Sequence, residues 1–371
     1  MACRTWATSN MIIESRAPTR IDLAGGTVDL WPLHLFLKNP LTVNLAIDLW
    51  ASTRLEEVIS GSQNVILRSE DQQAEVKISW DDVLSDAPIT VIPQLELHLK
   101  LLRFFARKKE TRPQGGLTLT TLARSPAGAG LGGSSTLSVS MVGALATWAR
   151  GGNPIDPTLE GEKFIDVVRD VETTVIQVPA GVQDYYGAMF GGLQALRWGT
   201  GTHGREWLPE STLKELEKRL MLFYSGQSRN SGINNWALFK AFIDQSADVR
   251  TRFEKISQSA NDLESALRRL DWQDAGRAIA SEWQTRRTLA EAISTPEINH
   301  AFEAAFREGA TAGKVCGAGG GGCFFVYIPE PNEEIRAQIK SRIRSQIEAI
   351  GARLLPFRAV SRGLEIKVTR A

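Results

Sequence analysis

The sequence is poor in the residue types that build metal clusters and disulfide scaffolds. It has 371 residues but only three cysteines and four histidines. The cysteines are too few, odd in number and too irregularly spaced for a disulfide framework or a zinc cluster, namely Cys3, Cys316 and Cys323. We therefore expect reduced thiols and a cytoplasmic protein.

Long apolar runs and an excess of charge of one sign are also missing. No run approaches the roughly 20 apolar residues that a membrane span needs, and the first ten residues lack the apolar core of a secretory signal. The formal net charge of +1 gives no sign of an extended basic surface. Neither a membrane nor a nucleic acid is the expected partner.

What remains is an ordinary globular composition, with 43% hydrophobic and 23% charged residues, over a length that suggests two domains. We expect these domains at residues 1–205 and 206–371. Because no internal repeat, low-complexity tract or long linker is present, we expect the two domains to share a broad interface with the functional site between them.

The most informative stretch is a glycine loop at residues 125–135, which reads Ser-Pro-Ala-Gly-Ala-Gly-Leu-Gly-Gly-Ser-Ser. A strand pattern at 117–122 precedes it, and apolar residues from Leu137 to Trp148 follow it at helical spacing. Glycines let backbone N–H groups converge on an anion, and a helix N-terminus adds its positive dipole end. The loop is neither a Rossmann fingerprint nor a Walker loop, but it indicates phosphate binding.

Two further motifs flank this loop. Near the N-terminus, residues 16–30 read Arg-Ala-Pro-Thr-Arg-Ile-Asp-Leu-Ala-Gly-Gly-Thr-Val-Asp-Leu, and near the C-terminus five of the six residues at 317–322 are glycine. In this order the three motifs resemble those of the GHMP kinase superfamily, which includes galactokinase, homoserine kinase, mevalonate kinase and phosphomevalonate kinase. The resemblance spans residues 16 to about 328. One departure is Gly133, which replaces the first serine of the family pattern Pro-x-x-x-Gly-Leu-Gly-Ser-Ser.

This resemblance implies a two-domain α+β fold. The N-terminal domain would be like ribosomal protein S5 domain 2, and the C-terminal domain would be ferredoxin-like. It also implies ATP and Mg²⁺ as cofactors. The implied reaction is transfer of the γ-phosphoryl group to a small-molecule hydroxyl, in which catalysis comes mainly from positioning and electrostatics.

The resemblance assigns the nucleotide to the glycine loop. The implied cofactor-binding residues are Pro126, Gly128, Gly130, Leu131, Gly132, Gly133, Ser134 and Ser135. Magnesium would be held by the hydroxyl of Ser134 and by Glu172, which fits an ion that takes few protein ligands beside phosphate and water. Asp170 is the alternative carboxylate, two residues earlier and on a different face of the same expected helix.

The implied catalytic residues are Asp184 and Arg20. Asp184 would receive or orient the acceptor hydroxyl, and both roles stay open. The guanidinium of Arg20 beside it would keep this carboxylate ionised and screen charge on the transferred group.

The acceptor would lie against the first motif, the segment before Asp184 and the C-terminal glycines. The implied substrate-binding residues are Gly25, Gly26, Thr27, Asp29, Gln183, Arg229, Gly319 and Gly320. Gly26 and Thr27 stand where galactokinase has glutamate and histidine, which argues against galactose. Plainer roles stay open for several of these residues. Asp22 and Asp29 could cap turns, and Glu172 could be a solvated helix position. Trp31 and His34 could be structural residues, although Trp31 could instead line the sugar pocket.

The segments 183–192 and 224–229 most resemble the sugar kinases typified by D-glycero-D-manno-heptose 7-phosphate kinase. The first motif of those kinases reads Gly-Gly-Gly-Thr-Asp, whereas this chain has Gly-Gly-Thr-Val-Asp. If the acceptor is a sugar phosphate, Arg229 or Arg124 would hold its phosphate as a bidentate donor.

Three alternatives accompany this interpretation. The chain could phosphorylate the anomeric hydroxyl of an unphosphorylated sugar such as fucose, a uronic acid or a hexosamine. It could be a non-catalytic sensor of sugar and ATP, although a sensor has no need of Asp184, Glu172 and Ser134 together. A decarboxylase of the mevalonate branch is disfavoured by residues 183–192. A sugar or sugar phosphate is therefore the expected small-molecule partner, and a homodimer stays possible.

Overall fold

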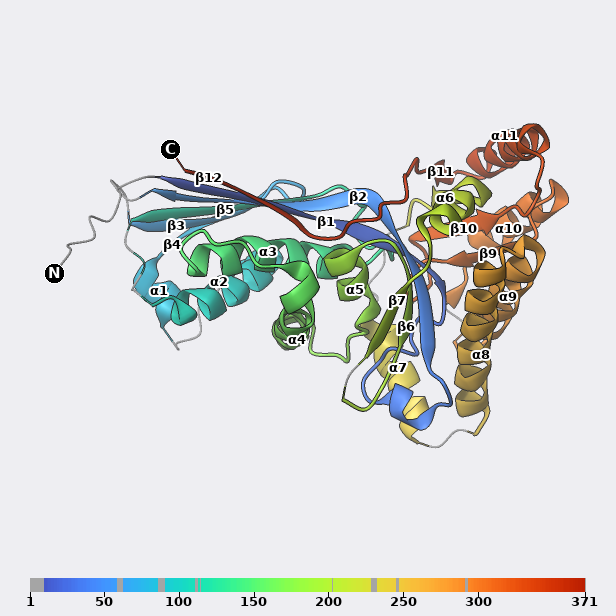
Figure 1. Cartoon of the computed structure of the whole chain (residues 1–371), viewed down its shortest axis with the longest axis horizontal. Coiled ribbons are helices and arrows are strands. Elements are labelled where there is room, and N and C mark those ends of the chain that lie inside the picture. The colour runs from blue at the N-terminus through green and yellow to red at the C-terminus, as the bar shows by residue number, and fades with distance from the viewer. Residues whose placement is uncertain are drawn as a thin grey trace.

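Two β-sheets, each packed against helices, organise the chain (Figure 1). The computed structural model describes residues 10–58, 63–85, 91–110, 113, 115–201, 203–227, 232–244, 247–290 and 293–370. Within these ranges, one sheet has eight strands and the other has four. Helices and strands mix in both halves, which confirms the predicted α+β fold.

The larger sheet follows the order β12-β1-β2-β5-β3-β4, with β6 and β7 attached to β2. Its neighbouring strands are antiparallel except for β3 and β5. Its strands are β1 (Met11–Ala24), β2 (Leu41–Val58), β3 (Asn64–Ser69), β4 (Ala74–Ser79), β5 (Gly116–Ala123), β6 (Leu193–Arg197), β7 (Gly204–Trp207) and β12 (Glu365–Arg370).

One face of this sheet is covered by helices (Figure 1). They are α1 (Trp80–Leu84), α2 (Glu96–Lys108), α3 (Gly133–Ala149), α4 (Pro157–Ile176) and α5 (Gln183–Phe190). Helix α3 packs against β1 and β2 on one side and against α2, α4 and α5 on the others. All of its residues from Ser138 to Trp148 are buried, as expected of a helix enclosed on all sides.

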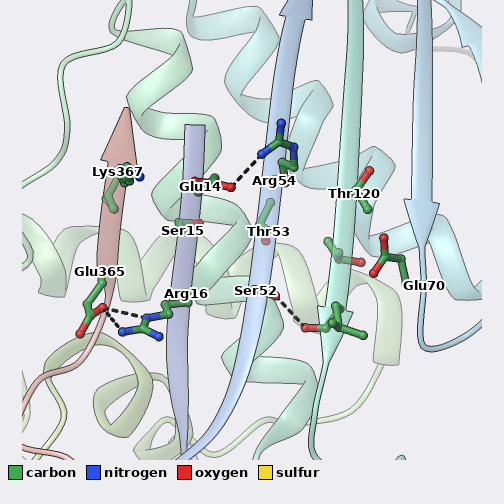
Figure 2. A pocket seen from close by; sticks show the side chains of 13 residues that line it. Glu14, Ser15, Arg16, Ser52, Thr53, Arg54, Glu70, Thr120, Glu365 and Lys367 are labelled. Carbon is green, nitrogen blue, oxygen red and sulfur yellow. Dashed lines mark hydrogen bonds and ion pairs between the residues drawn. The ribbon is translucent and has the colours of Figure 1, made fainter. Parts of the chain in front are cut away.

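Near the start of β1 and the end of β2, the opposite face of the sheet is polar and holds a shallow hollow of about 580 Å³ (Figure 2), whereas farther along these two strands the sheet packs against α8 (Ala247–Arg269). Alternation along β1 produces this difference, because Ile13 and Ser15 are buried whereas Glu14 and Arg16 face outward. Ion pairs cross the outer face from Arg16 to Glu365 at 2.7 Å and from Arg54 to Glu14 at 2.8 Å. These exposed pairs contribute little stability, about 0–1 kcal/mol each.

The smaller sheet has the order β11-β8-β10-β9 and is antiparallel throughout. Its strands are β8 (Leu220–Tyr224), β9 (Ala312–Val315), β10 (Cys323–Tyr327) and β11 (Arg353–Leu354). The helices of this half are α6 (Glu210–Arg219), α7 (Gly232–Ile243), α8 (Ala247–Arg269), α9 (Trp272–Arg286), α10 (Pro296–Arg307) and α11 (Glu333–Ala349), and short 3₁₀ turns lie at Leu33–Phe36 and Pro93–Leu95.

The end of the chain returns to the first sheet, where β12 pairs with β1 from Glu365 to Arg370 (Figure 1). The last strand of the predicted segment 206–371 therefore belongs to the larger sheet, while the boundary at residue 205 stays a prediction. Among the described residues, no helix is long and apolar enough to cross a lipid bilayer.

Helix α4 begins at a cap that the sequence supplies. The carboxylate of Asp156 accepts hydrogen bonds from the backbone N–H groups of Thr158 at 2.8 Å and Leu159 at 3.4 Å. Pro157 occupies the first helical position, where its missing N–H costs nothing. This cap fixes the start of the helix that carries Glu172 toward the glycine loop.

We expect Asp156→Ala to lower the free energy of unfolding by about 1 kcal/mol, because two N–H groups of the first turn lose their acceptor. Urea denaturation followed by circular dichroism measures this change. Asp156→Asn keeps a side-chain acceptor and serves as the control. An equal loss in both variants would contradict the capping role.

Candidate active site

A cavity of about 810 Å³ lies where the glycine loop, the loop after β1 and the C-terminal glycines meet. Its volume falls within the range of small-molecule sites, about 300–1,000 Å³. Its walls come from both halves of the chain, including Asp29 and Ser134 from the first and Arg286 and Gly319 from the second. The cavity therefore lies where the two halves of the chain meet.

The glycine loop forms one wall. Gly128, Gly130 and Gly132 have φ values of 67°, 75° and 72°, in the left-handed region that favours glycine. Gly132 then caps helix α3, which begins at Gly133, whereas the sequence predicts a start near Ser134 or Ser135. Backbone N–H groups at such a helix N-terminus form a ready anion site.

The C-terminal glycines at residues 317–322 pack closely against this loop. A Cβ on Gly317 would lie 2.8 Å from the Cα of Gly130, and the N–H of Cys323 donates to the carbonyl of Ala129 at 2.6 Å. Only glycine permits the first of these contacts. The C-terminal glycines therefore support the glycine loop through direct backbone contacts.

Asp184 and Arg20 pair at the floor of the cavity. The Arg20 Nε and Nη2 atoms lie 2.8 Å and 2.5 Å from Asp184 Oδ1, and the side chain of Asp184 is 21% exposed whereas Arg20 is buried. Burial raises the pKa of Asp184 above its ordinary value, and the charge of Arg20 opposes this rise. Asp184 also lies against Gly132, where a Cβ would come within 2.9 Å of its carboxylate.

Glu172 and Ser134 meet beside the helix N-terminus. The Ser134 hydroxyl donates to Glu172 Oε1 at 2.7 Å, and the Tyr185 hydroxyl donates to Glu172 Oε2 at 2.8 Å. Burial raises the pKa of Glu172, and these two hydrogen bonds oppose the rise. By contrast Asp170 is 69% exposed and pairs with Arg169. Of the two candidate carboxylates, Glu172 is the one that faces the cavity.

The loop after β1 forms the facing wall through Thr27, Asp29 and the neighbouring Gln183. Asp29 Oδ2 accepts from the N–H of Gln183 at 2.9 Å, which ties this loop to the start of α5. Burial chiefly, together with the charges of Asp184 and Asp22, raises the pKa of Asp29 to about 6. Asp29 is thus a buried acceptor that the loop aims at the cavity.

Two family models match this chain. The GHMP kinases N terminal domain matches residues 96–192, and the GHMP kinases C terminal domain matches residues 263–347. The chain belongs to the GHMP kinase superfamily.

The relatives of this GHMP kinase include sugar kinases. An L-fucokinase/L-fucose-1-P guanylyltransferase of Bacteroides fragilis is 27% identical over 349 residues, which cover 88% of this chain and only 36% of that longer protein. A D-glycero-alpha-D-manno-heptose 7-phosphate kinase of Campylobacter jejuni is 24% identical over 325 residues, which cover 85% of this chain and 89% of that protein.

Two solved structures support the fold. A D-glycero-D-manno-heptose 1-phosphate kinase from Bacteroides thetaiotaomicron superposes with a TM-score of 0.72 at 22% identity, covering 96% of this chain and 98% of the other. A Lactococcus lactis galactokinase complexed with galactose gives a TM-score of 0.69 at 14% identity, covering 95% of each chain. The arrangement of the two halves is therefore that of GHMP kinases.

Most of the residues assigned from the sequence line the cavity of this GHMP kinase. They are Arg20, Thr27, Asp29, Pro126, Gly128, Gly130, Gly132, Gly133, Ser134, Ser135, Glu172, Gln183, Asp184 and Gly319. Leu131 is buried, and its carbonyl accepts from the N–H of Arg20 at 3.2 Å. It supports the loop without facing the cavity.

Other assigned residues lie off the cavity wall. The N–H of Gly25 donates to Glu282 at 3.3 Å, Gly26 packs on Asp22, and the N–H of Gly320 donates to the carbonyl of Ile293 at 2.8 Å. Arg124 is exposed and is not part of the lining. Arg229, proposed for a second phosphate, and Cys3 lie outside the described residues.

Trp31, His34 and the two remaining cysteines also lie outside the lining. Trp31 is 56% exposed, and its ring lies 5.7 Å from that of the buried His34. Cys316 and Cys323 are buried free thiols. The backbone carbonyl of Cys316 accepts from Arg20 at 3.1 Å, so this residue contributes its backbone rather than its thiol.

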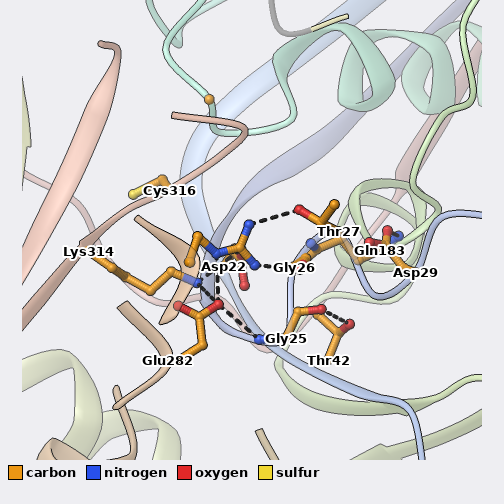
Figure 3. A network of polar contacts seen from close by, with 12 residues as sticks. Asp22, Gly25, Gly26, Thr27, Asp29, Thr42, Gln183, Glu282, Lys314 and Cys316 are labelled. Carbon is orange, nitrogen blue, oxygen red and sulfur yellow. Dashed lines mark hydrogen bonds and ion pairs between the residues drawn. The ribbon is translucent and has the colours of Figure 1, made fainter. Parts of the chain in front are cut away.

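Sequence reasoning missed a buried charge cluster behind the loop after β1, formed by Asp22, Glu282, Arg286 and Lys314 (Figure 3). Burial alone would raise the pKa of Asp22, but Lys314 and Arg286 hold it below its ordinary value. Asp22 is therefore part of an ion network and not a turn cap. The available signal was the spacing of Glu282 and Arg286, which are four residues apart on a helix.

We expect Gly132→Ala to lower kcat by roughly 100-fold, because its Cβ would displace the Asp184 carboxylate. Gly151→Ala is the matched control, since Gly151 has a φ of 67° but no atom within 4 Å of an added Cβ. Both variants should lose about 1–2 kcal/mol of unfolding free energy to backbone strain. ADP-release kinetics and urea denaturation measure the two effects. Equal kcat values in both variants would contradict the clash with Asp184.

Proposed function

We propose that this GHMP kinase transfers the γ-phosphoryl group of ATP to a hydroxyl of a sugar or a sugar phosphate. The observation that supports this most is the placement of the Asp184–Arg20 pair in one cavity with the glycine loop. A phosphate held at the loop and a hydroxyl held at Asp184 would be neighbours. Positioning of this kind supplies most of the catalysis in phosphoryl transfer.

Each residue of the pair has a distinct task. Asp184 accepts a hydrogen bond from the acceptor hydroxyl and thereby orients it toward the phosphoryl group. Arg20 keeps Asp184 ionised and provides positive charge beside the transferred group. The backbone N–H groups of the glycine loop and the N-terminus of α3 bind the phosphates.

Ser134 and Glu172 would hold Mg²⁺. A hydroxyl and a buried carboxylate with oxygens 2.7 Å apart suit a hard cation, and Glu172, whose pKa burial raises, gains a charge partner. Within the described ranges, no group of three or more acidic, histidine or cysteine side chains could hold a metal alone, so phosphate and water would complete the shell. Bound Mg²⁺ supplies charge neutralisation of the ATP phosphates.

The wall formed by Thr27, Asp29 and Gln183 suits a ligand that carries hydroxyl groups. The side-chain carbonyl oxygen of Gln183 is buried and has no hydrogen-bond partner among the described residues. The residue nevertheless lines the cavity, and an amide group can both donate to and accept from a ligand hydroxyl. Asp29 and Thr27 add two more oxygens nearby. A polyhydroxylated acceptor such as a sugar satisfies this set.

A free sugar is the second candidate acceptor, because the arginines that line the cavity already pair with carboxylates. Among the described lining residues, the arginines are Arg20 and Arg286, and each already pairs with a carboxylate, Asp184 or Glu282. A heptose phosphate therefore requires its phosphate to be bound from residues such as Arg229. A free sugar that receives the phosphoryl group on its anomeric hydroxyl requires no such cation.

We place this reaction in the cytoplasm, where ATP is abundant and the free thiols of Cys316 and Cys323 would stay reduced. A homodimer stays the candidate assembly.

A coupled ADP-release screen with ATP and Mg²⁺ tests the proposal, with free sugars and sugar phosphates supplied as acceptors. Turnover on one sugar phosphate supports the first candidate, and turnover on a free sugar supports the second. Nucleotide binding without turnover on any acceptor would favour the sensor alternative.

We expect Asp184→Asn to lower kcat by about 10²–10⁴-fold, because the acceptor hydroxyl loses its charged hydrogen-bond partner. Asp170→Asn is the matched control, since Asp170 lies on the exposed face of α4. Steady-state ADP release measures both variants. Wild-type turnover in Asp184→Asn, or equal losses in the two variants, would refute the assignment of Asp184.

We expect kcat/KM for the acceptor to rise with pH through an inflection at about 6, the pKa of Asp29, since the ionised carboxylate is the better acceptor of hydroxyl protons. The same raised pKa means that ionising Asp29 costs folding stability as pH rises from 3.8 to about 6. A pH–rate profile measures the inflection. Asp29→Asn should remove it, and an inflection that persists in this variant would assign it to another group.

A further inference from the structure

The buried charge cluster extends from the core of the second half to the loop that faces the acceptor (Figure 3). Lys314 Nζ lies 2.8 Å from Glu282 Oε1 and 3.1 Å from Asp22 Oδ2, and Arg286 Nε lies 2.8 Å from the same Glu282 oxygen. The four side chains are at most 3% exposed, and their charges balance. Such a cluster is held rigidly, because removing one partner would strand a buried charge.

Arg286 is the member of the cluster that reaches the loop. Its Nη1 donates to Thr27 Oγ1 at 2.8 Å, and its Nη2 donates to the carbonyl of Gly26. Gly26 is itself seated on the cluster, because a Cβ there would lie 2.0 Å from Asp22 Oδ2. The guanidinium fork thus joins α9 to the loop across 259 positions of sequence.

Thr27 has a conformation that needs such support. Its φ is 68°, in the left-handed region that β-branched residues rarely adopt. Strained conformations persist where the surroundings determine them, and they gather at functional sites. Thr27 lines the cavity, and Asp29 follows two residues later.

We propose that Arg286 is a positioning residue for the acceptor. It holds Thr27 and Gly26 so that the loop from Gly25 to Asp29 presents its oxygens to the cavity. The inference rests on the proposed kinase function and adds to it a residue that sets affinity for the acceptor and not for ATP. Since the Thr27 oxygen accepts from Arg286, its own O–H is left to donate to an acceptor oxygen.

Thr27→Val is the decisive variant, because it removes the hydroxyl while keeping the β-branched shape and all four buried charges. We expect KM for the acceptor to rise by about 10-fold or more, as for loss of a hydrogen bond to a charged donor. KM for ATP should stay within about 2-fold. Thr27→Ser keeps the hydroxyl and should restore acceptor KM to near the wild-type value.

Arg286→Gln completes a double-mutant cycle with Thr27→Val. If Arg286 acts through Thr27, the double variant should raise the acceptor KM little more than Arg286→Gln alone. Full additivity of the two effects would overturn the proposal. Thermal unfolding checks that Arg286→Gln folds. If it does not, hydrogen–deuterium exchange of Thr27→Val without acceptor decides the question, because loss of a direct bond to the acceptor leaves the unliganded loop unchanged.

Hydrogen–deuterium exchange tests the loop without relying on catalysis. The N–H groups of Val28 and Leu30 donate to the carbonyls of Gly25 and Thr27, so their exchange reports the loop conformation. We expect faster exchange of peptides covering residues 25–30 in Thr27→Val, and wild-type exchange in Thr27→Ser.

The outcomes separate the two claims. A wild-type protein that turns over no acceptor rejects the proposed function, while the exchange result still tests the loop. Unchanged exchange and unchanged acceptor KM in Thr27→Val would overturn the positioning role. A lower melting temperature with equal changes in KM for ATP and acceptor would also overturn it, since that pattern indicates a merely structural contact.

Discussion

The site depends on one buried cation, Arg20. Its guanidinium pairs with Asp184 and donates to the backbone carbonyls of Gly130 at 2.7 Å and Cys316 at 3.1 Å. These partners belong to α5, to the glycine loop and to the segment preceding the C-terminal glycines. A buried guanidinium requires all of its partners, because an unpaired charge in this environment is very costly. The carboxylate of Asp184 and the glycine loop therefore take their relative positions from the same side chain.

The two halves of the chain pack closely against each other because glycines lie at their contact. The C-terminal motif approaches the glycine loop so closely that Cβ atoms at Gly317 and Gly322 would meet the backbone of Gly130 and Ala129. At the loop after β1 the two halves are joined by buried charges instead, through Arg286 and Lys314. Close backbone packing fixes the wall formed by the glycine loop, whereas a polar network fixes the wall that contains Thr27.

Local backbone requirements explain what the sequence could predict. Glycines with positive φ before an apolar helical pattern indicated the phosphate loop, and helical periodicity placed Glu172 and Asp170 on different faces of α4. The family motifs supplied Asp184 and Arg20, whose pairing the structure then brought to 2.5 Å. Each of these features is encoded within a few residues.

Contacts between distant residues could not be predicted in this way. No local pattern connects Thr27 with Arg286, or β1 with β12. The sequence alone suggests two separate strand runs at residues 42–49 and 53–59, but the structure has one strand, β2, which pairs with β6 in its first part and with β5 in its second. The interruption of its pattern marks this change of partner and not a turn. Similarly, Gly25 and Gly26 stand in a substrate motif, yet they seat the loop against α9.

The most direct test of the central claim is ³¹P NMR of the wild-type protein incubated with ATP, Mg²⁺ and each candidate sugar. The account predicts one new phosphomonoester signal on a single class of sugar acceptor, in equal amount to the ADP formed. ATP hydrolysis that yields inorganic phosphate alone, or an unchanged ATP spectrum with every acceptor despite bound nucleotide, would contradict it.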